Sequence, residues 1–311
     1  MYTRRDFIKK SAAAGMFISF AGVPAGLINN EGLKKVTILH TNDTHSRLEP
    51  FEADHPKYAN KGGVANRAVL VEEIRKQEKN VLLLDAGDIF QGTPYFNFYK
   101  GELNFKLMSM LKYDAATLGN HDFDNGIDGF ESQLHHCNFP FLICNYDLSN
   151  TVLNGKVEKY KIFEFDGVKI GVTGVGIELD GLVDPRNYDN VIYQDPVEKA
   201  EEMAKELKEK HNCSYVIVLS HLGYKYKRDK VSDVVLAKNT ENIDLIIGGH
   251  THTFMEEPDI IENKKGEKVT VVQAGFAGIK LGRLDLYFSE GKKVDALAFN
   301  QLDVNENGEL A

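Results

Sequence analysis

Cysteine is scarce in this sequence of 311 residues, which contains only Cys137, Cys144 and Cys213. Three widely spaced cysteines are too few for a disulfide framework, and they form no CxxC pair of the kind that holds a metal ion. We therefore interpret them as small buried apolar groups. A disulfide between Cys137 and Cys144 stays open as an alternative in an oxidising compartment, because the sequence does not define its geometry.

Arginine is also scarce once the first 30 residues are set aside, since six arginines remain and none of them cluster. Residues 1–30 contain four basic side chains and one acidic one, a net charge of +3, so the formal −9 of the whole chain becomes −12 for the rest. This acidic balance argues against a nucleic-acid polymer as partner. A phosphate-bearing substrate would have to be held by something other than a basic patch, and metal ions are the obvious substitute.

Long apolar runs are absent except near the start of the chain. Residues 1–30 combine a basic stretch, TRRDFIKK, with a modest apolar run, and the paired Arg4 and Arg5 resemble a twin-arginine export signal. The apolar run is short for a membrane span and is interrupted by glycines and Pro24, so we favour cleavage or lipid anchoring over an uncleaved membrane anchor. We expect an exported protein, periplasmic or at the cell surface, with no other membrane association.

The remaining residues, 31–311, contain no internal repeat and no low-complexity linker, and we expect them to form one domain. Short apolar runs alternate with amphipathic ones, which is typical of an α/β sandwich or a doubly wound sheet. The expected strands are Val36–His40, Val81–Asp85, Ala115–Leu118, Phe141–Asn145, Lys169–Gly174, Tyr215–Ser220, Leu245–Gly248 and Val269–Gln273. The expected helices are Gly63–Lys76, Glu102–Leu111 and Pro196–Lys210, the last with an N-terminal cap at Asp195.

Residues of metal-binding type follow five of these strands. They are Asp43 and His45 after the first strand, Asp85 and Asp88 after the second, Asn120 and His121 after the third, His221 after VIVLS, and His250 and His252 after LIIGG. Ligand sites in open α/β sheets lie at the carboxyl ends of strands. For any one histidine a structural role is the simpler interpretation, but five such coincidences favour a shared site.

The ligand types indicate the kind of metal. Carboxylates, imidazoles and an amide, without a thiolate, suit divalent Zn, Mn, Fe or Co. Six or seven candidate ligands exceed the needs of one ion. The sequence therefore predicts two divalent ions that share a carboxylate, an arrangement that suits in-line displacement at phosphorus.

The stretch GNHDFD, from Gly119 to Asp124, combines an amide, an imidazole and two carboxylates within six residues. Asn120 offers a neutral oxygen to a cation, while His121 and Asp124 have the types needed for a base oriented by a carboxylate. Alone, the stretch is equally compatible with a polar turn that closes a strand.

These motifs, in this order, resemble the calcineurin-like metallophosphoesterases and in particular their 5'-nucleotidase branch. The matching phrases are ILHTNDTHSRLEP, GGVANRAVLVEEIR, LLLDAGDIFQGTPYFN, TLGNHDFDNG and IIGGHTHT. The resemblance extends from about Lys35 to Phe288 and implies a β-sandwich flanked by helices in a single catalytic domain.

The resemblance also implies roles for individual residues. One ion would be held by Asp43, His45, Asp88 and His252, and the other by Asp88, Asn120, His221 and His250. Asp88 would then be the bridge, His121 would be the catalytic histidine and Asp124 would orient it. Asp85 has no ligand role in the pattern and is expected to be structural.

The implied function is an exported two-metal phosphohydrolase that cleaves phosphate monoesters, with 5'-nucleotides as the first expectation. A hydroxide held by the ions would attack phosphorus in line, and His121 would assist the leaving group. The alternatives are hydrolysis of cyclic nucleotides, phosphodiesters or other phosphoesters, or a catalytic subunit whose substrate-binding domain is a separate chain. Binding without catalysis on the same fold is a weaker alternative.

Nucleotidases of this family usually carry a second domain that grips the base and the phosphates, and the present sequence ends at Ala311. Arg47, Arg67 and an aromatic run are candidates to replace it locally. For the aromatic run, which comprises Phe90, Tyr95, Phe96, Phe98 and Tyr99, we favour core packing over base stacking.

Overall fold

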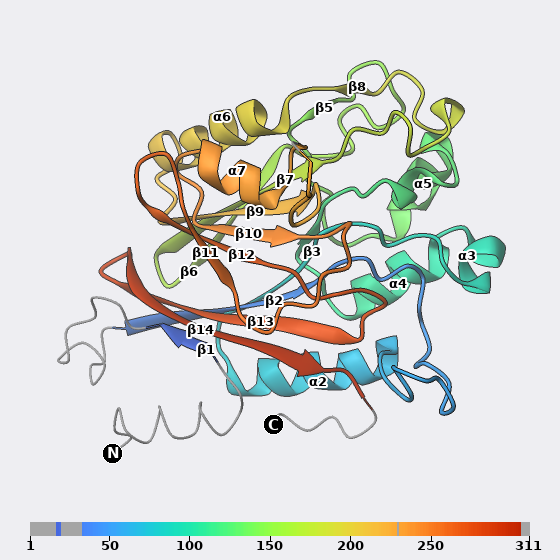
Figure 1. Ribbon diagram of the computed structural model, residues 1–311, viewed down its shortest axis with the longest axis horizontal. Helices are drawn as coiled ribbons and strands as arrows, with labels where there is room; N and C mark the ends of the chain where they lie inside the picture. The colour runs from blue at the N-terminus through green and yellow to red at the C-terminus, as the bar shows by residue number, and fades with distance from the viewer. Residues whose placement is uncertain (1–16, 20–32, 229, 306–311) are drawn as a thin grey trace.

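The computed structural model describes residues 17–19, 33–228 and 230–305, and it consists of two six-stranded sheets that pack face to face (Figure 1). The first sheet has the order β1-β14-β13-β2-β3-β4 and the second the order β11-β12-β10-β9-β7-β6. The strands of the first sheet are β1 (Phe17–Ser19), β2 (Leu33–Thr41), β3 (Val81–Asp85), β4 (Ala115–Ala116), β13 (Lys280–Ser289) and β14 (Lys292–Asp303). Those of the second are β6 (Tyr160–Phe165), β7 (Val168–Gly176), β9 (Tyr215–His221), β10 (Leu245–Gly248), β11 (Asp259–Glu262) and β12 (Lys268–Val272).

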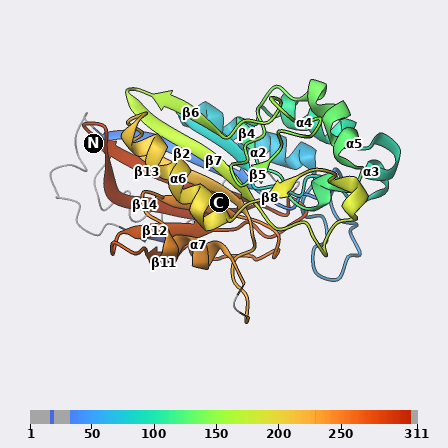
Figure 2. The same ribbon diagram turned by 90° about the horizontal axis from the view of Figure 1, so that it is seen from above.

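The helices lie on the outer faces of the two sheets. They are α2 (Val64–Gln77), α3 (Pro94–Tyr99), α4 (Glu102–Met110), α5 (Ile127–Gln133), α6 (Pro196–Glu209) and α7 (Asp233–Asn239), with short 3-10 turns η1 (His121–Phe123), η2 (Leu134–His136) and η3 (Pro185–Asn187). A small ribbon of β5 (Tyr146–Asp147) and β8 (Ile192–Tyr193) lies apart from both sheets. Seen from above, α6 and α7 lie over the second sheet (Figure 2).

The layers follow from a two-residue alternation within the strands, because successive side chains of a strand point to opposite faces. In β3, Leu82 and Leu84 face the second sheet, while Leu83 faces the helices. In β9, Ile217 and Leu219 face the first sheet, while Val216 and Val218 pack beneath α6 and α7. The strands are therefore apolar on both faces, as expected of sheets covered on both sides.

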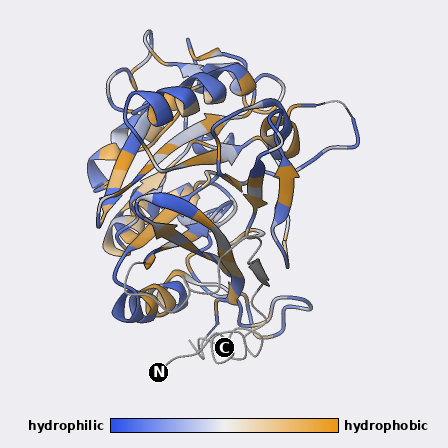
Figure 3. Ribbon diagram, turned by 90° about the vertical axis from the view of Figure 1, so that its left-hand side faces the viewer, coloured by the Kyte–Doolittle hydropathy of each residue, from blue (hydrophilic) through white to orange (hydrophobic). Residues whose placement is uncertain are grey.

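The helices are amphipathic, and both hydrophilic and hydrophobic colours run along them in Figure 3. In α6 the buried side chains include Ala200, Met203, Ala204 and Leu207, spaced three to four residues apart. The side chain of Asp195 accepts hydrogen bonds from the backbone amides of residues 197 and 198, at 2.8 and 3.1 Å. The predicted helix and its N-terminal cap are confirmed.

The α/β sandwich that the sequence predicted is confirmed, and so are most of the expected strands and all three expected helices. One expected strand, Phe141–Asn145, is wrong. Its backbone amides bond to three different segments: Leu142 to Ala116, Ile143 to Glu158, and Cys144 to Gly174. The segment therefore bridges between other elements and joins no ladder, although its apolar composition is that of a strand. The expected strand Ala115–Leu118 is shortened to β4.

Several predictions concern cysteines and the start of the chain. All three cysteines are free; Cys144 and Cys213 are buried as interpreted, whereas Cys137 is partly exposed. The predicted export signal, residues 1–30, lies outside the described residues except for β1, whose backbone pairs with β14. Within the described part of the chain, no helix has the length and apolar character needed to cross a membrane.

His40, in β2, has a fully buried side chain. It is 0% exposed, and neither ring nitrogen has a hydrogen-bond partner within the part of the chain that the structure describes. The ring packs on Gly282, where an added Cβ would lie only 2.0 Å from its Nε2 atom. Burial lowers the pKa of His40 to about 3, because a charged imidazolium is disfavoured away from water.

His40 should therefore make the stability of the protein dependent on pH. As the pH falls below the ordinary histidine pKa of about 6.5, His40 binds a proton in the unfolded chain but stays neutral in the folded chain. The contribution of His40 to stability is therefore lost between about pH 6.5 and pH 3. We expect the His40 contribution to the free energy of unfolding to fall by roughly 1.3 kcal/mol between pH 7.5 and pH 5.5.

Urea unfolding at these two pH values measures the effect. His40→Met, which has a similar volume and does not titrate, should show a pH-dependent loss that is smaller than that of the unmodified protein by this amount, whatever its absolute stability. His135→Met, a change at an exposed histidine, is the control and should keep the original slope. Equal slopes in His40→Met and the unmodified protein would refute the assignment.

Candidate active site

Two groups of metal-binding side chains meet at one end of the sandwich. Asp43, His45 and His252 form the first group, and within it one potential ligand atom of each residue lies within 4.8 Å of the others. Asp88, His221 and His250 form the second group under the same criterion. All six had been predicted from the sequence as metal ligands, and the structure brings them together.

The strand order explains why these residues meet. Parallel strands β2 and β3 are neighbours in the first sheet, and β9 and β10 are neighbours in the second. Asp43 and Asp88 follow the first pair, while His221 and His250 end or follow the second. The carboxyl ends of both pairs lie at the same end of the sandwich, so each sheet contributes to the site.

The side chains approach closely within each group. In the first group, His252 Nε2 lies 3.3 Å from Asp43 Oδ1 and 3.0 Å from His45 Nε2. In the second group, His221 Nε2 lies 3.1 Å from Asp88 Oδ2. Asn120 Oδ1 lies 2.8 Å from His250 Nδ1, which places the amide beside the second group.

Asp88 lies between the two groups. Its Oδ2 atom is 3.1 Å from His221 Nε2, in the second group, and 3.9 Å from His45 Nε2, in the first. Its Oδ1 atom accepts a hydrogen bond from the backbone amide of His121 at 2.7 Å. A glycine at position 119 is required here, because an added Cβ would lie 2.1 Å from Asp88 Oδ1.

Backbone carbonyls orient two of the imidazoles by contacting Nδ1, so that Nε2 of each ring points toward the centre of the site. His45 Nδ1 lies 3.1 Å from the carbonyl oxygen of Phe90, and His221 Nδ1 lies 2.7 Å from that of Ala86. A carbonyl oxygen accepts a hydrogen bond, so each Nδ1 donates, and in the neutral imidazole each Nε2 then carries the lone pair that a metal ion would take. This backbone support of the outer nitrogen is typical of metal-ligating histidines.

His221 Nε2 gives a direct test of whether the residues fit a cation. It is buried and, among the described residues, makes no hydrogen bond of good geometry, although it lies 3.1 Å from Asp88 Oδ2. Burial disfavours the imidazolium, but the Asp88 carboxylate outweighs it and raises the pKa of His221 to about 10. Burial likewise disfavours the carboxylate of Asp88, but His221 outweighs it and holds the pKa of Asp88 below its usual range. The centre thus requires positive charge, and a divalent cation would satisfy it.

The backbone at the site adopts a conformation that is rare outside glycine. The φ angles of Asp43, His45, Asp88, His250 and His252 are 50°, 48°, 56°, 67° and 52°. Left-handed backbone at non-glycine residues costs energy and clusters at functional sites. Tight turns of this kind direct neighbouring side chains toward one point, which an extended strand end would not do.

His121 and Asp124 form a separate pair at the edge of the groups. His121 Nδ1 lies 2.8 Å from Asp124 Oδ2, and the His121 side chain is 36% exposed. The hydrogen bond to Asp124 raises the pKa of His121 against the opposing effect of burial. The ring centres of His121 and His45 are 5.4 Å apart. His121 therefore faces the first group while remaining open to solvent.

The sequence analysis missed two buried residues that hold the site together. Asp122 accepts hydrogen bonds from the backbone amides of residues 88, 89, 90 and 119, at 2.8 to 3.1 Å. Asn42 donates to Asp43 Oδ2 and to the carbonyl of Gly275, each at 2.6 Å. The carboxylate inside GNHDFD and the amide before Asp43 were the available signals, but residue type alone does not reveal burial.

Asp85, Arg67 and Arg47, which the sequence analysis also singled out, lie in different environments. Asp85 is buried and accepts hydrogen bonds from Thr41 Oγ1 at 2.5 Å and from the amide of Gly87 at 2.9 Å, which agrees with a structural role. Arg67 is only 4% exposed, so it is not presented to a substrate at the surface. Arg47 is ion-paired with Glu52.

The aromatic run divides into two parts. Phe90 and Phe96 are buried, as predicted, and their ring centres are 5.4 Å apart. Core packing is wrong for Phe98 and Tyr99, which are 81% and 45% exposed. The short helix α3 turns these two rings away from the core that receives Phe96.

A two-layer β-sandwich between helices, with two groups of acidic and histidine side chains at one end, defines a fold of metallophosphoesterase type. The sequence matches the calcineurin-like phosphoesterase family over residues 36–254, and the chain belongs to that family. The family resemblance seen in the sequence is thereby confirmed.

The most informative relatives are 5'-nucleotidases. The snake venom 5'-nucleotidase of Crotalus adamanteus is 35% identical over 297 residues, and the human 5'-nucleotidase is 35% identical over 298. These alignments cover 89% of this chain but 49% and 50% of the relatives. The chain thus spans about half the length of the curated relatives it matches.

Two solved structures of nucleotidases are similar to this chain over about half of their own length. A 5'-nucleotidase precursor from Thermus thermophilus is 33% identical, with a TM-score of 0.81 over 88% of this chain and 55% of that one. An NAD nucleotidase from Haemophilus influenzae is 28% identical, with a TM-score of 0.76 over 88% of this chain and 50% of that one.

The position of Asp88 between the groups predicts that its charge is needed to retain both ions. Asp88→Asn keeps the size of the side chain but removes the shared negative charge. We expect the variant, after metal reconstitution and dialysis, to retain at most one of two metal equivalents by elemental analysis.

Asp85→Asn is the matched control, because it removes the charge of a buried carboxylate in the same loop that bonds only to Thr41 and Gly87 among the contacts described above. It should retain both equivalents. Two full equivalents in Asp88→Asn would overturn the bridging assignment.

Proposed function

We propose that this protein is an exported, metal-dependent phosphohydrolase that cleaves phosphate monoesters, with 5'-nucleotides as its substrate class. The observation that carries the proposal is the position of Asp88 between two metal-binding groups, beside a histidine that is oriented by a carboxylate and open to solvent. The names of the relatives support nucleotides as substrates.

The residues divide into two ligand sets. Asp43, His45 and His252 would hold one ion, and Asn120, His221 and His250 would hold the other, with Asp88 shared between them. Two divalent ions, when bound, would neutralise charge on the phosphoryl oxygens and lower the pKa of a water molecule. The donor set of carboxylates, imidazoles and one amide suits Zn, Mn, Fe or Co and does not select among them.

The chain's own contribution to bond cleavage is made by His121. Asp124 accepts the Nδ1 proton, which fixes the ring and leaves Nε2 for the substrate. The backbone amide of the same residue anchors Asp88 Oδ1, so the position of the imidazole is tied to that of the bridge. A proton held at Nε2 would pass to the departing alkoxide oxygen as the ester bond breaks.

Export is a prediction from the sequence. The twin-arginine-like signal lies outside the described residues apart from β1. A substrate-binding domain supplied by a separate chain, and hydrolysis of cyclic nucleotides or phosphodiesters, are the alternatives that the family resemblance implies.

The experiment that tests the function is hydrolysis by the metal-reconstituted protein of a 5'-nucleotide, a cyclic nucleotide and an aryl phosphate. We expect release of phosphate from the 5'-nucleotide. Protein with two bound ions that releases no phosphate from the 5'-nucleotide or the aryl phosphate would refute the proposal, whether or not it opens the cyclic nucleotide to a monoester.

His121→Asn should separate catalysis from metal binding. The variant removes the imidazole but none of the proposed ligands, so we expect both metal equivalents to remain while turnover of an alkyl phosphate falls by roughly 10²- to 10⁴-fold. Asp124→Asn should cause a smaller loss, because the imidazole would remain but would be poorly oriented.

The leaving group provides the control for the role of His121. A phenol of low pKa needs little protonation, so the defect of His121→Asn should shrink on an activated aryl phosphate. An equal defect on both esters would contradict the general-acid role, and loss of metal from His121→Asn would contradict the division of roles.

A further inference from the structure

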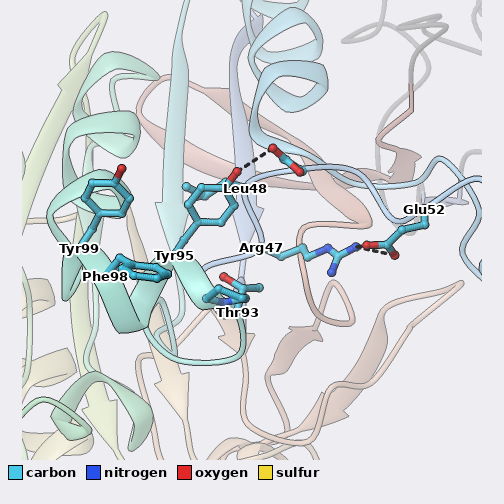
Figure 4. Close-up of a pocket in the computed structure, with 9 residues that line it drawn as sticks. Arg47, Leu48, Glu52, Thr93, Tyr95, Phe98 and Tyr99 are labelled. Atoms are coloured by element: carbon cyan, nitrogen blue, oxygen red, sulfur yellow. Dashed lines mark hydrogen bonds and ion pairs between the residues drawn. The ribbon is translucent and has the colours of Figure 1, made fainter.

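A pocket of about 780 Å³ opens beside the site, between α3 and the loop that follows His45. Its lining consists of Arg47, Leu48, Glu49, Glu52, Thr93, Pro94, Tyr95, Phe98 and Tyr99. Figure 4 shows the aromatic rings of residues 95, 98 and 99 gathered on the α3 side, with Arg47 and Glu52 on the other side. We call this the aromatic pocket.

The aromatic pocket lies beside the first metal-binding group, because the loop that follows His45 forms one of its walls. Arg47 is only two residues from His45, which limits the separation of their Cα atoms to about 7 Å. Gly92, which precedes the lining residues Thr93 and Pro94, packs so closely against His45 that an added Cβ would lie 2.9 Å from the Cβ of His45. Thr93 Oγ1 donates to the carbonyl of Ser46 at 2.7 Å and joins the two walls.

The charges of the pocket exclude a phosphate and favour a base. Glu49 and Glu52 are acidic, and the only cation of the lining, Arg47, is ion-paired with Glu52 at 3.1 Å. An anionic group would be repelled, whereas the amino groups of a nucleobase could donate to carboxylates. Tyr95 donates to Glu49 at 2.6 Å, which restrains both side chains.

The exposed rings supply the stacking surface. Phe98 and Tyr99 are 81% and 45% exposed, although large aromatic side chains are usually buried. Every nucleobase has a flat face that stacks on such rings, and the volume of the pocket suits a small-molecule ligand.

We propose that the aromatic pocket binds the base of a 5'-nucleotide while its phosphate lies at the two metal-binding groups. The proposal rests on the proposed function and adds to it the location of the base and a preference for bases that carry an amino group. Binding in this pocket requires no second domain, because both subsites are formed by residues 43–52, 88–99 and the strand ends already described.

Adenosine 5'-monophosphate and ribose 5-phosphate form the matched pair of substrates, because they share the phosphate ester and differ by the base. The double variant Phe98→Ala, Tyr99→Ala should lower kcat/KM for the nucleotide by about 5- to 150-fold, mainly through KM, the range measured for loss of one stacked base. Its kcat/KM for ribose 5-phosphate should stay unchanged.

Two variants control for other causes. Phe98→Tyr keeps an aromatic ring and should retain the preference for the nucleotide. Ile192→Ala truncates another exposed apolar side chain, 52% exposed on β8 and outside the pocket, and should leave both substrates unaffected. A nucleotide preference that survives the double variant, or that is absent from the unmodified protein, would overturn the proposal and leave the exposed rings to a protein contact.

A binding measurement separates this proposal from the proposed function. The sequence contains no tryptophan, so Phe98→Trp creates a single fluorescent reporter in the pocket. Adenosine, which has no phosphate, should quench its emission with saturation in the absence of metal, whereas Ile192→Trp should show no saturable quenching.

The outcomes are distinguishable. Saturable quenching at position 98 without hydrolysis of either phosphate ester would support the aromatic pocket and refute the proposed function. Hydrolysis of both esters at equal efficiency, without quenching, would support the proposed function and refute the aromatic pocket.

Discussion

The buried carboxylates of Asp43 and Asp88 set the electrostatic requirement that the rest of this end of the molecule meets. They are 0% and 1% exposed, and an ionised group removed from water needs hydrogen bonds and opposite charge. Backbone amides supply the first: that of His250 donates to both oxygens of Asp43 at 3.0 Å, and that of His121 donates to Asp88. Amides reduce the cost of burial but do not neutralise charge. The Nε2 atoms of His45 and His221 face the Asp88 carboxylate, and a divalent cation bound there would supply the opposite charge.

Asp122 maintains the backbone that makes this arrangement possible. Asp88 has a φ of 56°, a conformation that an isolated aspartate turn would readily leave. The carboxylate of Asp122 accepts hydrogen bonds from three consecutive amides, of residues 88 to 90, and so stabilises that turn. Because Asp122 follows His121 directly, the same short stretch that presents the imidazole also fixes the position of Asp88. The positions of the His121 imidazole and the Asp88 carboxylate are therefore coupled through the short segment 119–122.

Sequence patterns predicted those parts of the fold that depend on local periodicity. The apolar strands of the two sheet centres and the amphipathic α6 have regular spacing, and the polar residues at the strand ends could be identified before any pairing was known. The wrongly assigned strand Phe141–Asn145 shows the limit, because apolar composition specifies burial but not which backbone the amides will meet. The strands β13 and β14 mix polar and apolar residues, so they were missed although they pair extensively with each other and with β2.

The candidate ligands could be predicted because they follow recognisable strands. The prediction of the site was incomplete because its supporting residues follow no local pattern. Ligand types stand at strand ends in the sequence, but the left-handed turns that aim them, and the buried supports Asn42 and Asp122, depend on contacts between distant segments. The aromatic run shows this most clearly. Phe96 and Phe98 are identical in type and two residues apart, yet one is 7% exposed and the other 81%, because a helical turn places them on different sides of α3.

The division of α3 between core and surface has a consequence for substrate selection. Phe96 packs against Phe90, whose carbonyl oxygen lies 3.1 Å from His45 Nδ1, so the helix that carries the exposed rings is fixed to the same segment that orients a metal-binding histidine. The distance between the aromatic pocket and the two metal-binding groups is then set by packed core residues of one domain. We therefore expect selection in this chain to depend on the fit of the sugar that joins base and phosphate, because neither end of the substrate could shift to accommodate a different length.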